Sequence, residues 1–525
     1  MMKVLVSDNI SPKGIEILKG AGLDVDVRVG LGPEELKGAI PAYHGLVIRS
    51  ATRVTADIID AAVNLKVIGR AGSGLDNVDR AAATKKGIVV MNTPGGNTIT
   101  AAEHTMAMLF SLARPIPQAS ESMKRGVWDK KRFMGVELYG KTLGLVGMGN
   151  IGGQVAKKAR GLEMNVIAYD PFLNEEKAKS LGVEPVGLEE LWKRADFITV
   201  HTPLTPETKN LINAGTLSLM KDGVRVINCA RGGIVNEDDL LGALNSGKVA
   251  GAALDVFETE PPRDYSLCRH ENVVCTPHLG AATKEAQENV AVAVAEQVAD
   301  YLVRGTIRNA VNFPSIPVEQ VPLLAPYINL AEKMGGFAAQ VFEYAPRELT
   351  IEYMGEASGF NAGPVTMAAV KGFLAPALGD TVNFVNAPLI ARERGIEIRE
   401  TRTPESGDYR SMLCLRIKGE MEGYLCGTLF SRKDPRIIGL DGAQVEIIPE
   451  GTMLFMMNND RPGLIGAVGT FLGSHGINIA RMFFGRESEG GTAISVVSVD
   501  SPLTGELLRE LRDIPNILSV KQVVL

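Results

Sequence analysis

Six histidines could exchange a proton near neutral pH, because an unperturbed imidazole titrates close to pH 6.5. They are His44, His104, His201, His270, His278 and His475. Two of them, His201 and His278, follow short apolar runs in the middle of the chain that we interpret as buried strands. Because ligands bind outside the carboxyl ends of parallel strands, both are candidates for a general acid or base, and position alone does not separate them.

Charged residues in three short stretches could complete an acid–base site. Arg231 precedes two glycines in NCARGGIV, His278 follows a proline in CTPHLG, and DVFETEPP supplies both Glu258 and Glu260. A carboxylate beside an imidazole raises the pKa of the imidazole, and a guanidinium can bind a substrate carboxylate through two parallel hydrogen bonds. These stretches predict an Arg–Glu–His site, with the choice between Glu258 and Glu260 left open.

The stretch GLVGMGNIG has the glycine spacing of a dinucleotide-binding turn. Gly147, Gly149 and Gly152 follow the apolar run TLGLV and precede the helix pattern GQVAKKAR. Such glycines bring the N–H groups of a helix N-terminus to a pyrophosphate. Asp170 ends the next apolar run, where a carboxylate binds a ribose and repels a 2′-phosphate. We therefore predict NAD as the cofactor and hydride transfer as the reaction.

Small or polar residues end three further apolar runs. Thr202 and Pro203 end FITVHTP, Cys229 and Ala230 lie in VRVINCARG, and Asp255 follows GAAL. Consecutive parallel strands end at one edge of a sheet, so we expect these residues to line the same crevice. Nothing in the sequence indicates a lowered pKa for the Cys229 thiol, which we expect to pack and not to react.

Arginines near N-terminal strand ends suit a phosphorylated substrate. Arg49, Arg53 and Arg70 lie in GLVIRSATRV and VIGRAGSGLDNVD. Arginine forms charge-assisted hydrogen bonds with phosphate and carboxylate groups. The basic run at 130–132, in WDKKRFMG, is interpreted as an ordinary solvated surface.

Strand and helix patterns alternate through the first 300 residues or so, which is typical of parallel α/β layers. A long helical run from Thr98, ITAAEHTMAMLFSLARPIPQA, leaves the first unit, and the helix KEAQENVAVAVAEQVADYLV returns to it. This pattern predicts one domain inserted in another. The proline-rich stretch FPSIPVEQVPLLAP is interpreted as a linker to a third α/β unit.

From Thr452 to the end, the predicted order strand, helix, strand, strand, helix, strand suits a ferredoxin-like sandwich. The predicted domains are 1–97 together with 283–312, then 98–282, 313–450 and 451–525.

The 525-residue chain has a formal net charge of −6, which gives no general attraction for nucleic acid. Its five cysteines are scattered and lack metal-site spacing, so we expect reduced thiols and no metal. The N-terminus does not have the pattern of a signal peptide, and no apolar run reaches the roughly 18 residues of a membrane span. We expect a cytoplasmic protein.

The middle of the chain resembles the D-isomer-specific 2-hydroxyacid dehydrogenases. The resemblance rests on GLVGMGNIG, FITVHTPLTPET, MKDGVRVINCARGGIVNEDDL, ALDVFETEPP and TPHLGAAT. It implies an NAD-binding Rossmann domain inserted in a flavodoxin-like substrate domain. It also implies Arg231, Glu260 and His278 as the catalytic set, and so favours Glu260 over Glu258.

The same resemblance implies ligand contacts along the crevice. The implied cofactor contacts are Ser73, Gly147, Gly149, Asn150, Ile151, Gly152, Asp170, Thr202, Pro203, Cys229, Ala230, Arg231, Asp255, His278, Leu279, Gly280 and Ala281. The implied substrate contacts are Arg49, Arg70, Ser73, Gly74, Arg231 and His278. Ser73 stands where many members have threonine, and the hydroxyl is kept.

GLVIRSATRV, FVNAPLIARERGIEI and NNDRPGLIGAVGTFLGSHGINIARM extend the resemblance to the long phosphoglycerate-oxidising members of the family, over essentially the whole chain. This resemblance implies an α/β intervening domain and a C-terminal ferredoxin-like ACT domain, with L-serine as effector at Asn458, Asp460 and Asn478. It implies 3-phosphoglycerate as substrate, 3-phosphohydroxypyruvate as product in serine synthesis, and a homo-oligomer, either a tetramer or a dimer. Asn458 occupies a position that varies among members, and the alternative is a purely structural ACT unit that dimerises without binding serine.

Two other functions fit the residues. The substrate could be another D-2-hydroxy acid, such as 2-hydroxyglutarate or glyoxylate/glycerate. Turnover rates measured with and without the 3-phosphate distinguish these substrates from the phosphorylated one. A non-catalytic NAD-sensing regulator controlled by the ACT unit would tolerate the loss of Glu260 or His278, yet both are present.

Overall fold

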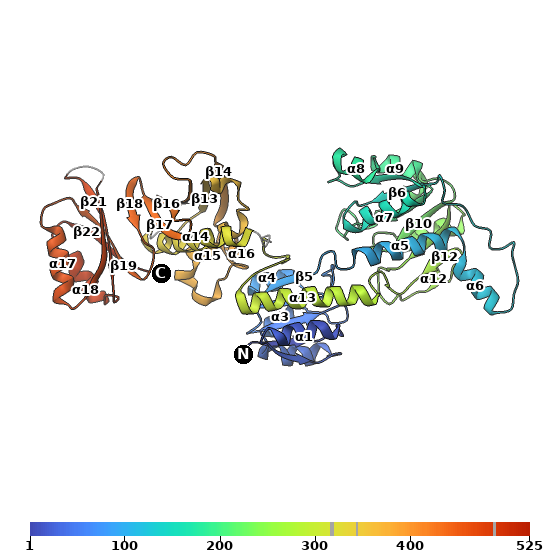
Figure 1. Cartoon of the computed structure of the whole chain (residues 1–525), viewed down its shortest axis with the longest axis horizontal. Coiled ribbons are helices and arrows are strands. Elements are labelled where there is room, and N and C mark those ends of the chain that lie inside the picture. Colours follow the sequence, from blue (N-terminus) through green and yellow to red (C-terminus); the bar gives the residue numbers. More distant parts are fainter. Residues whose placement is uncertain (315–319, 343–344, 487–489) are drawn as a thin grey trace.

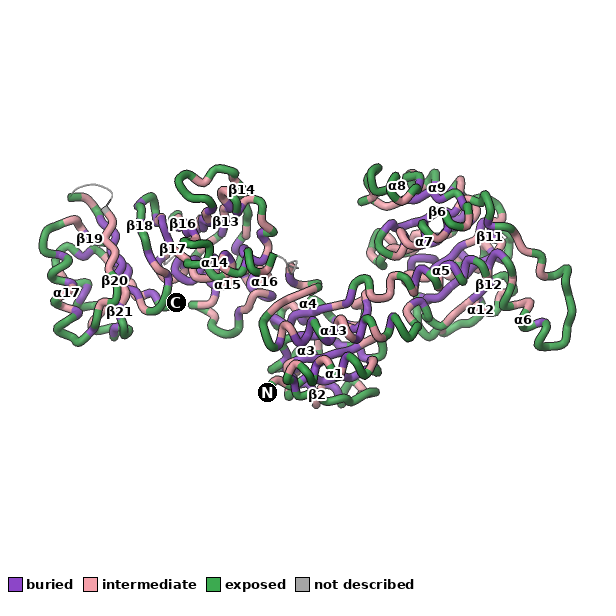
Figure 2. The backbone as a smooth tube through the Cα atoms, in the orientation of Figure 1, coloured by how far each residue is buried: buried purple, intermediate pink, exposed green. Residues whose placement is uncertain are grey.

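The structure is a computed structural model that describes residues 1–314, 320–342, 345–486 and 490–525. It contains four β-sheets in chain order, each with helices packed against it (Figure 1). The buried residues lie mainly on these strands and helices and are mostly apolar (Figure 2). No helix within the described residues is long and apolar enough to cross a membrane. The α/β architecture is the predicted one, and the limits of the four domains stay a prediction.

The first sheet has five parallel strands in the order β2-β1-β3-β4-β5, which is that of flavodoxin-like folds. Its strands are β1 (Lys3–Val6), β2 (Asp24–Val27), β3 (Gly45–Ile48), β4 (Val67–Arg70) and β5 (Val89–Asn92). Its helices are α1 (Pro12–Gly20), α2 (Pro33–Ala39), η1 (Ile40–Ala42), α3 (Ala56–Ala61), α4 (Arg80–Lys86) and the returning α13 (Lys284–Arg304).

Two glycines let the returning helix α13 lie directly on this unit. A Cβ atom at Gly69 in β4 would lie 2.6 Å from Val298 and 2.7 Å from Val294. A Cβ atom at Gly14 in α1 would lie 2.8 Å from the carbonyl oxygen of Ala291. The return of the chain predicted after Pro277 is therefore confirmed, because α13 is part of the first apolar core.

The second sheet has seven parallel strands in the order β12-β11-β10-β9-β6-β7-β8. Its strands are β6 (Thr142–Val146), β7 (Asn165–Tyr169), β8 (Glu184–Pro185), β9 (Phe197–Val200), β10 (Val224–Asn228), β11 (Val249–Leu254) and β12 (Val273–Cys275). Its helices are α5 (Thr98–Ala113), α6 (Ile116–Lys124), α7 (Asn150–Gly161), α8 (Glu175–Leu181), α9 (Leu188–Arg194), α10 (Ala214–Leu219), α11 (Glu237–Asn245) and α12 (Ser266–Arg269). This is the predicted Rossmann sheet, whose strand order reverses between β6 and β9 and so places the ligand crevice there.

The single helix predicted from Thr98 is wrong, because the chain forms two helices there. α5 ends at Ala113, and Arg114 after it has φ −129° and ψ 89°. Pro115 follows, and a proline disfavours the helical conformation of the residue before it. The Arg–Pro pair is the local cause of the break, and α6 begins at Ile116.

The third sheet has the order β14-β13-β15-β16-β17-β18, in which β13 and β14 pair in parallel and the other neighbours pair antiparallel. Its strands are β13 (Glu348–Gly355), β14 (Glu397–Thr403), β15 (Ser411–Lys418), β16 (Glu422–Phe430), β17 (Asp434–Leu440) and β18 (Ala443–Ile447). Its helices are α14 (Val321–Val341), η3 (Glu356–Gly359), α15 (Gly363–Leu378), η4 (Gly379–Thr381) and α16 (Ala387–Glu393).

The predicted proline-rich linker is wrong in its second half. Helix α14 already begins at Val321, with Pro322 in its first turn, where a helix does not need the missing N–H group. Residues 315–319 of the same stretch lie outside the described residues. Pro322 therefore lies at the start of a helix and Pro326 inside the same helix, instead of in a linker.

The fourth sheet has the order β20-β21-β19-β22. Its elements are β19 (Thr452–Asn459), α17 (Leu464–Ser474), β20 (Ile479–Arg486), β21 (Thr492–Val499), α18 (Gly505–Arg512) and β22 (Ile517–Val524). This confirms the predicted ferredoxin-like unit. Gln340 of α14 exchanges two hydrogen bonds with the backbone of Val524, which joins this unit to the third.

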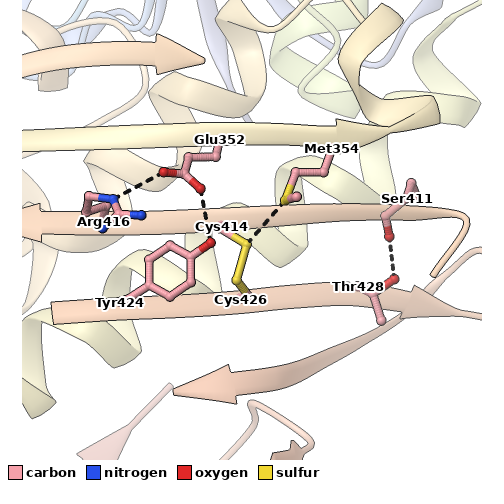
Figure 3. Close-up of a disulfide and its surroundings, with 8 residues drawn as sticks. All are labelled: Glu352, Met354, Ser411, Cys414, Arg416, Tyr424, Cys426 and Thr428. Atoms are coloured by element: carbon pink, nitrogen blue, oxygen red, sulfur yellow. Dashed lines mark hydrogen bonds and ion pairs between the residues drawn. A yellow bond between two sulfur atoms is a disulfide. The ribbon is translucent and has the colours of Figure 1, made fainter. Parts of the chain in front are cut away.

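The expectation of reduced thiols is wrong for two of the five cysteines. Cys414 of β15 and Cys426 of β16 form a disulfide, shown in Figure 3. They lie directly opposite each other in an antiparallel pair, with their Cα atoms 4.1 Å apart. Directly opposite side chains in such a pair lie close together, and this register cannot be read from the spacing of the two cysteines along the chain.

Candidate active site

The predicted dinucleotide turn joins β6 to α7. Gly147 has φ 96°, and a Cβ atom there would lie 2.7 Å from the carbonyl oxygen of His201. A Cβ atom at Gly152 would lie 2.0 Å from the carbonyl oxygen of Gly147, whereas Gly149 has open space around it. The first and third glycines are thus required by the protein itself. The second leaves room for a phosphate at the N-terminus of α7.

Asp170 lies beside this turn, just after β7. Its Oδ2 atom accepts a hydrogen bond from the Met148 N–H at 2.7 Å, and its Oδ1 atom accepts one from the Phe172 N–H at 2.8 Å. A carboxylate held next to an open glycine turn suits the ribose of a dinucleotide. The turn, the helix N-terminus and this carboxylate together fit NAD.

The end of β10 is shaped by Asn228, which the sequence patterns did not single out. Its amide accepts a hydrogen bond from the Ala230 N–H at 3.0 Å and donates one to the Arg231 carbonyl oxygen at 2.9 Å. Asn228 therefore sets the path of the chain from Cys229 to Arg231. Burial raises the pKa of Cys229 to about 12, as expected for a thiol that packs and does not react.

The two candidate histidines differ in their surroundings. The ring of His201 hydrogen-bonds to Thr199, and burial lowers its pKa to about 4, so His201 stays neutral. The Nδ1 atom of His278 lies 2.6 Å from a carboxylate oxygen of Glu260. That hydrogen bond raises the pKa of His278 above its usual value. Of the two, His278 has the environment of a general acid or base.

Glu260 faces His278, and Glu258 does not. Burial raises the pKa of Glu260, but the hydrogen bond to His278 outweighs burial, and the pKa lies below its usual value. Its other oxygen accepts a hydrogen bond from the Phe257 N–H at 3.1 Å. The exposed carboxylate of Glu258 lies 3.9 Å from Lys209. The geometry therefore pairs Glu260 with the imidazole.

Asp255 supports the turn that carries His278. This carboxylate accepts hydrogen bonds from the Thr276 hydroxyl at 2.6 Å and from the N–H groups of Leu279 and Gly280 at 2.7 and 2.8 Å. Its backbone carbonyl accepts the His278 N–H at 2.9 Å. His278 has φ 54°, a left-handed conformation that is uncommon outside glycine. The Asp255 network holds it there.

His104 of α5 completes this network, although sequence position gave it no role. Its Nε2 atom lies 3.1 Å from Asp255 and 3.1 Å from the Thr276 hydroxyl. Burial raises the pKa of Asp255, but the hydrogen bonds from His104 and Thr276 outweigh burial and lower it. The pattern AEHTMAML places His104 on a helix far along the chain from His278, so only the fold reveals the contact.

Arg231 extends from the second unit to the first. Its Nε atom donates to Asp76 at 3.0 Å, and its Nη1 atom donates to the carbonyl oxygen of Ala230 at 2.7 Å. A Cβ atom at Gly74 would lie 2.2 Å from Nη2 of Arg231. Gly74 is therefore needed for the guanidinium to lie across the loop of the first unit.

A cavity of about 370 Å³ brings cations and the acid–base pair together. Its walls include Arg49 and Arg70 from the first unit and Glu260 and His278 from the second. The Nε atom of Arg70 is buried and, within the described residues, has no hydrogen-bond partner. Burial and then the nearby Arg231 lower the pKa of Arg70 to about 10. These walls favour an anionic ligand.

The other predicted contacts have varied positions. Arg53 is exposed and is not among the residues that line this cavity, and the basic run at 130–132 is exposed as predicted. The Ser73 hydroxyl donates to Asn97 at 2.8 Å, and Asn97 lines the cavity. The Thr202 hydroxyl is buried without a hydrogen-bond partner among the described residues. No cluster of metal-binding side chains occurs in the same residues.

The predicted effector residues have partners inside the fourth unit. Asn458 is buried and accepts a hydrogen bond from Ser495 at 2.6 Å. Asn478 donates to Asp500 at 2.8 Å, and Asp460 accepts the Gly490 N–H at 3.1 Å. Their binding of an effector stays a prediction.

Three family models match the chain in succession. Residues 106–280 match the NAD binding domain of D-isomer specific 2-hydroxyacid dehydrogenases. Residues 323–441 match the intervening domain of D-3-phosphoglycerate dehydrogenase, and residues 452–516 match the ACT domain.

Curated relatives are similar over the full chain. The D-3-phosphoglycerate dehydrogenase of Synechocystis is 46% identical over 98% of this chain and 94% of its own, and that of Archaeoglobus fulgidus is 45% identical over all of both chains. The human D-3-phosphoglycerate dehydrogenase is 45% identical over 84% of each chain.

Solved structures match the first part of the fold. The TT0316 protein of Thermus thermophilus is 38% identical, with a TM-score of 0.55, over 59% of this chain and 100% of its own. A glyoxylate reductase from Paecilomyes thermophila is 28% identical, also with a TM-score of 0.55, over 59% of this chain and 98% of its own.

Replacing Gly152 with alanine should weaken NADH binding about tenfold or more, because the added Cβ would displace the Gly147 carbonyl and distort the turn. The matched control is Gly153→Ala in the same helix, where the nearest atom to the new Cβ is 4.0 Å away. Titration followed by NADH fluorescence measures both. Wild-type affinity in the Gly152 variant would contradict the assignment of the turn.

Replacing His104 with alanine should lower the free energy of unfolding by about 1–3 kcal/mol, because the buried Asp255 loses a donor. His104→Gln retains an N–H donor and should recover part of the loss. Urea denaturation measures both variants. If the alanine variant is as stable as the wild type, the network does not depend on His104.

Proposed function

The chain belongs to the D-3-phosphoglycerate dehydrogenase family, and from that membership we propose that it oxidises the C2 hydroxyl of D-3-phosphoglycerate with NAD. The product is 3-phosphohydroxypyruvate, the first intermediate of L-serine biosynthesis. The cavity that joins Arg49 and Arg70 to Glu260 and His278 carries the proposal. A substrate with a hydroxyl group and two anionic ends suits an acid–base pair that faces cations.

His278 accepts the hydroxyl proton during oxidation and returns it during reduction. Glu260 holds Nδ1 of the ring at 2.6 Å, which leaves Nε2 for the substrate and stabilises the charged imidazole that forms. The bound nicotinamide supplies the hydride acceptor. The pair therefore does the proton transfer, and its geometry is set before the substrate arrives.

Arg231 binds the substrate carboxylate and polarises the C2 oxygen. In the structure its guanidinium already pairs with a carboxylate, that of Asp76, at 3.0 Å. A substrate carboxylate offers the same chemistry and can accept two parallel hydrogen bonds. Ser73 and Gly74, on the loop that Arg231 meets, complete this end of the substrate site.

Arg49 and Arg70 bind the phosphate at the other end. Both lie in or just after strands of the first unit, and the unpartnered Nε of Arg70 needs an acceptor. Guanidinium groups bind phosphate through charge-assisted hydrogen bonds. These two arginines would make the site prefer a 3-phosphorylated acid over 2-hydroxy acids that lack the phosphate.

Residues at the carboxyl ends of β6, β7, β9, β10 and β11 would hold NAD. Gly147, Gly149, Gly152 and the first residues of α7 would bind its pyrophosphate, and Asp170 would bind the ribose. The remaining contacts come from Thr202, Pro203, Cys229, Ala230 and Asp255 and from His278, Leu279, Gly280 and Ala281.

The assembled enzyme is a homo-oligomer, a dimer or a tetramer. Large apolar side chains are exposed on α6 and on the segment after it, including Val127, Trp128 and Met134. Trp128 is 80% exposed and Met134 83% exposed, which is unfavourable in water and suits contact with a second copy.

The ACT unit binds L-serine as an effector, and the enzyme acts in the cytoplasm.

Glu260→Gln should move the acidic limb of kcat/KM for oxidation to lower pH. The carboxylate raises the pKa of His278, and oxidation needs the neutral ring, so loss of the charge lets the ring lose its proton at a lower pH. The maximal rate should fall by about 10²-fold or more, because the charged imidazole loses its partner. An unchanged pH profile would remove Glu260 from the proton transfer, and NADH binding serves as the folding control.

Arg49→Ala should raise KM for D-3-phosphoglycerate by about 10- to 100-fold, because the phosphate loses its charge-assisted hydrogen bonds to the guanidinium. The matched control is Arg53→Ala, whose exposed side chain lies outside the cavity lining. Rates of NADH formation with D-3-phosphoglycerate and with D-glycerate compare the two substrates. An equal loss on both would show that Arg49 does not bind the phosphate and would favour an unphosphorylated 2-hydroxy acid.

A further inference from the structure

A second cavity lies on another side of the Glu260–His278 pair. Its volume is about 390 Å³, and it shares Glu260, Pro277 and His278 with the cationic cavity described above. Its other walls include Phe257, Tyr265 and two prolines after Glu260. The proposed proton transfer makes no use of this space, although the same two side chains form part of its wall.

Two free thiols line this second cavity. Cys268 lies on α12 and Cys275 ends β12, and neither is part of the disulfide of the third unit. Both residues are partly exposed, and the helix and the strand that carry them pack against each other. Two thiols that line the same cavity can react as a pair, which a single cysteine cannot do.

We propose that Cys268 and Cys275 form a modification site at which an oxidant of the peroxide class makes an intramolecular disulfide beside the acid–base pair. In the first step one of the two sulfurs is oxidised to a sulfenic acid, and hydrogen peroxide is reduced to one molecule of water. In the second step the other thiol displaces hydroxide from that sulfur, and the hydroxide takes the thiol proton to give a second molecule of water. The new S–S bond replaces two S–H bonds, and two electrons pass to the peroxide.

Both sulfurs open onto a cavity wide enough for a small peroxide. Oxidation of either sulfur, followed by attack of the other, gives the same disulfide. Burial raises the pKa of Cys275, so this thiol gives up its proton as the S–S bond forms.

The disulfide acts on the active site through two short connections. Cys275 is three residues before His278, and Cys268 is on the helix that follows the Glu260 loop. Forming a bond of about 2.05 Å draws α12 toward β12 and so shifts these two segments relative to each other. Small displacements of a catalytic pair lower the rate strongly. This second part of the inference rests on the proposed function.

Mass spectrometry of the full-length protein tests the chemistry without any need for activity. After hydrogen peroxide and alkylation of the remaining thiols, trypsin should release residues 264–269 linked to residues 270–284. Phenylarsine oxide, which needs two neighbouring thiols, should bind the untreated chain once and should not bind Cys268→Ser or Cys275→Ser. Cys229 is a free thiol in every variant, so it serves as the control for arsenical binding to a single cysteine. Absence of the linked peptide, or arsenical binding to the single variants, would overturn the proposal.

Rates of NADH formation test the consequence. Peroxide should lower the wild-type rate at least fivefold, and dithiothreitol should restore it. Cys268→Ser and Cys275→Ser should lose less than twofold under the same treatment, with thermal melting used to confirm that both variants fold. If the linked peptide forms and the rate does not change, the modification site stands and its effect on the acid–base pair is refuted. A chain inactive before treatment would refute the proposed function and leave the peptide result to decide the site.

Discussion

A buried carboxylate determines the shape of the turn that carries the acid–base histidine. Asp255 is 1% exposed, and its oxygens accept hydrogen bonds from Thr276, Leu279 and Gly280, while its carbonyl accepts the His278 N–H. A charge survives in a protein interior only when donors of this kind replace water. A different path of the turn would leave Asp255 with fewer donors. The left-handed conformation of His278 is therefore held by the hydrogen bonds of its neighbour, and the direction of the imidazole follows from it.

The turn belongs to one unit, and the cations that face it belong to another. Arg49 follows β3 and Arg70 ends β4 in the first sheet, whereas His278 follows a strand of the second. Two helices, α5 and α13, connect the units (Figure 1). The Arg231–Asp76 ion pair joins the same two units. A ligand that contacts both the arginines of the first unit and His278 of the second binds best when the two units have one particular relative orientation. Substrate binding can thus select the placement in which proton transfer is possible.

Much of this arrangement could be predicted because it depends on local patterns. Strand ends and glycine spacing placed the Rossmann crevice, and CTPHLG supplied the candidate His278. DVFETEPP supplied both Glu258 and Glu260, and only the family resemblance favoured Glu260. The role of His104 could not be predicted, because α5 meets the catalytic turn only in the folded chain. The break at Pro115 had a local signal that helical periodicity concealed. The Cys414–Cys426 bond depends on strand register, which the spacing of cysteines does not determine.

The cationic cavity has an energetic consequence for the whole chain. The net charge of the protein is −6, yet Arg70 is mostly buried beside Arg231, and its Nε lacks a partner among the described residues. A buried cation that is not fully paired destabilises the folded state. A ligand with two anionic ends removes that destabilisation when it binds, so binding and folding stability are linked. Arg70 thus places an incompletely paired buried cation at the proposed substrate site, which favours a ligand with two anionic ends.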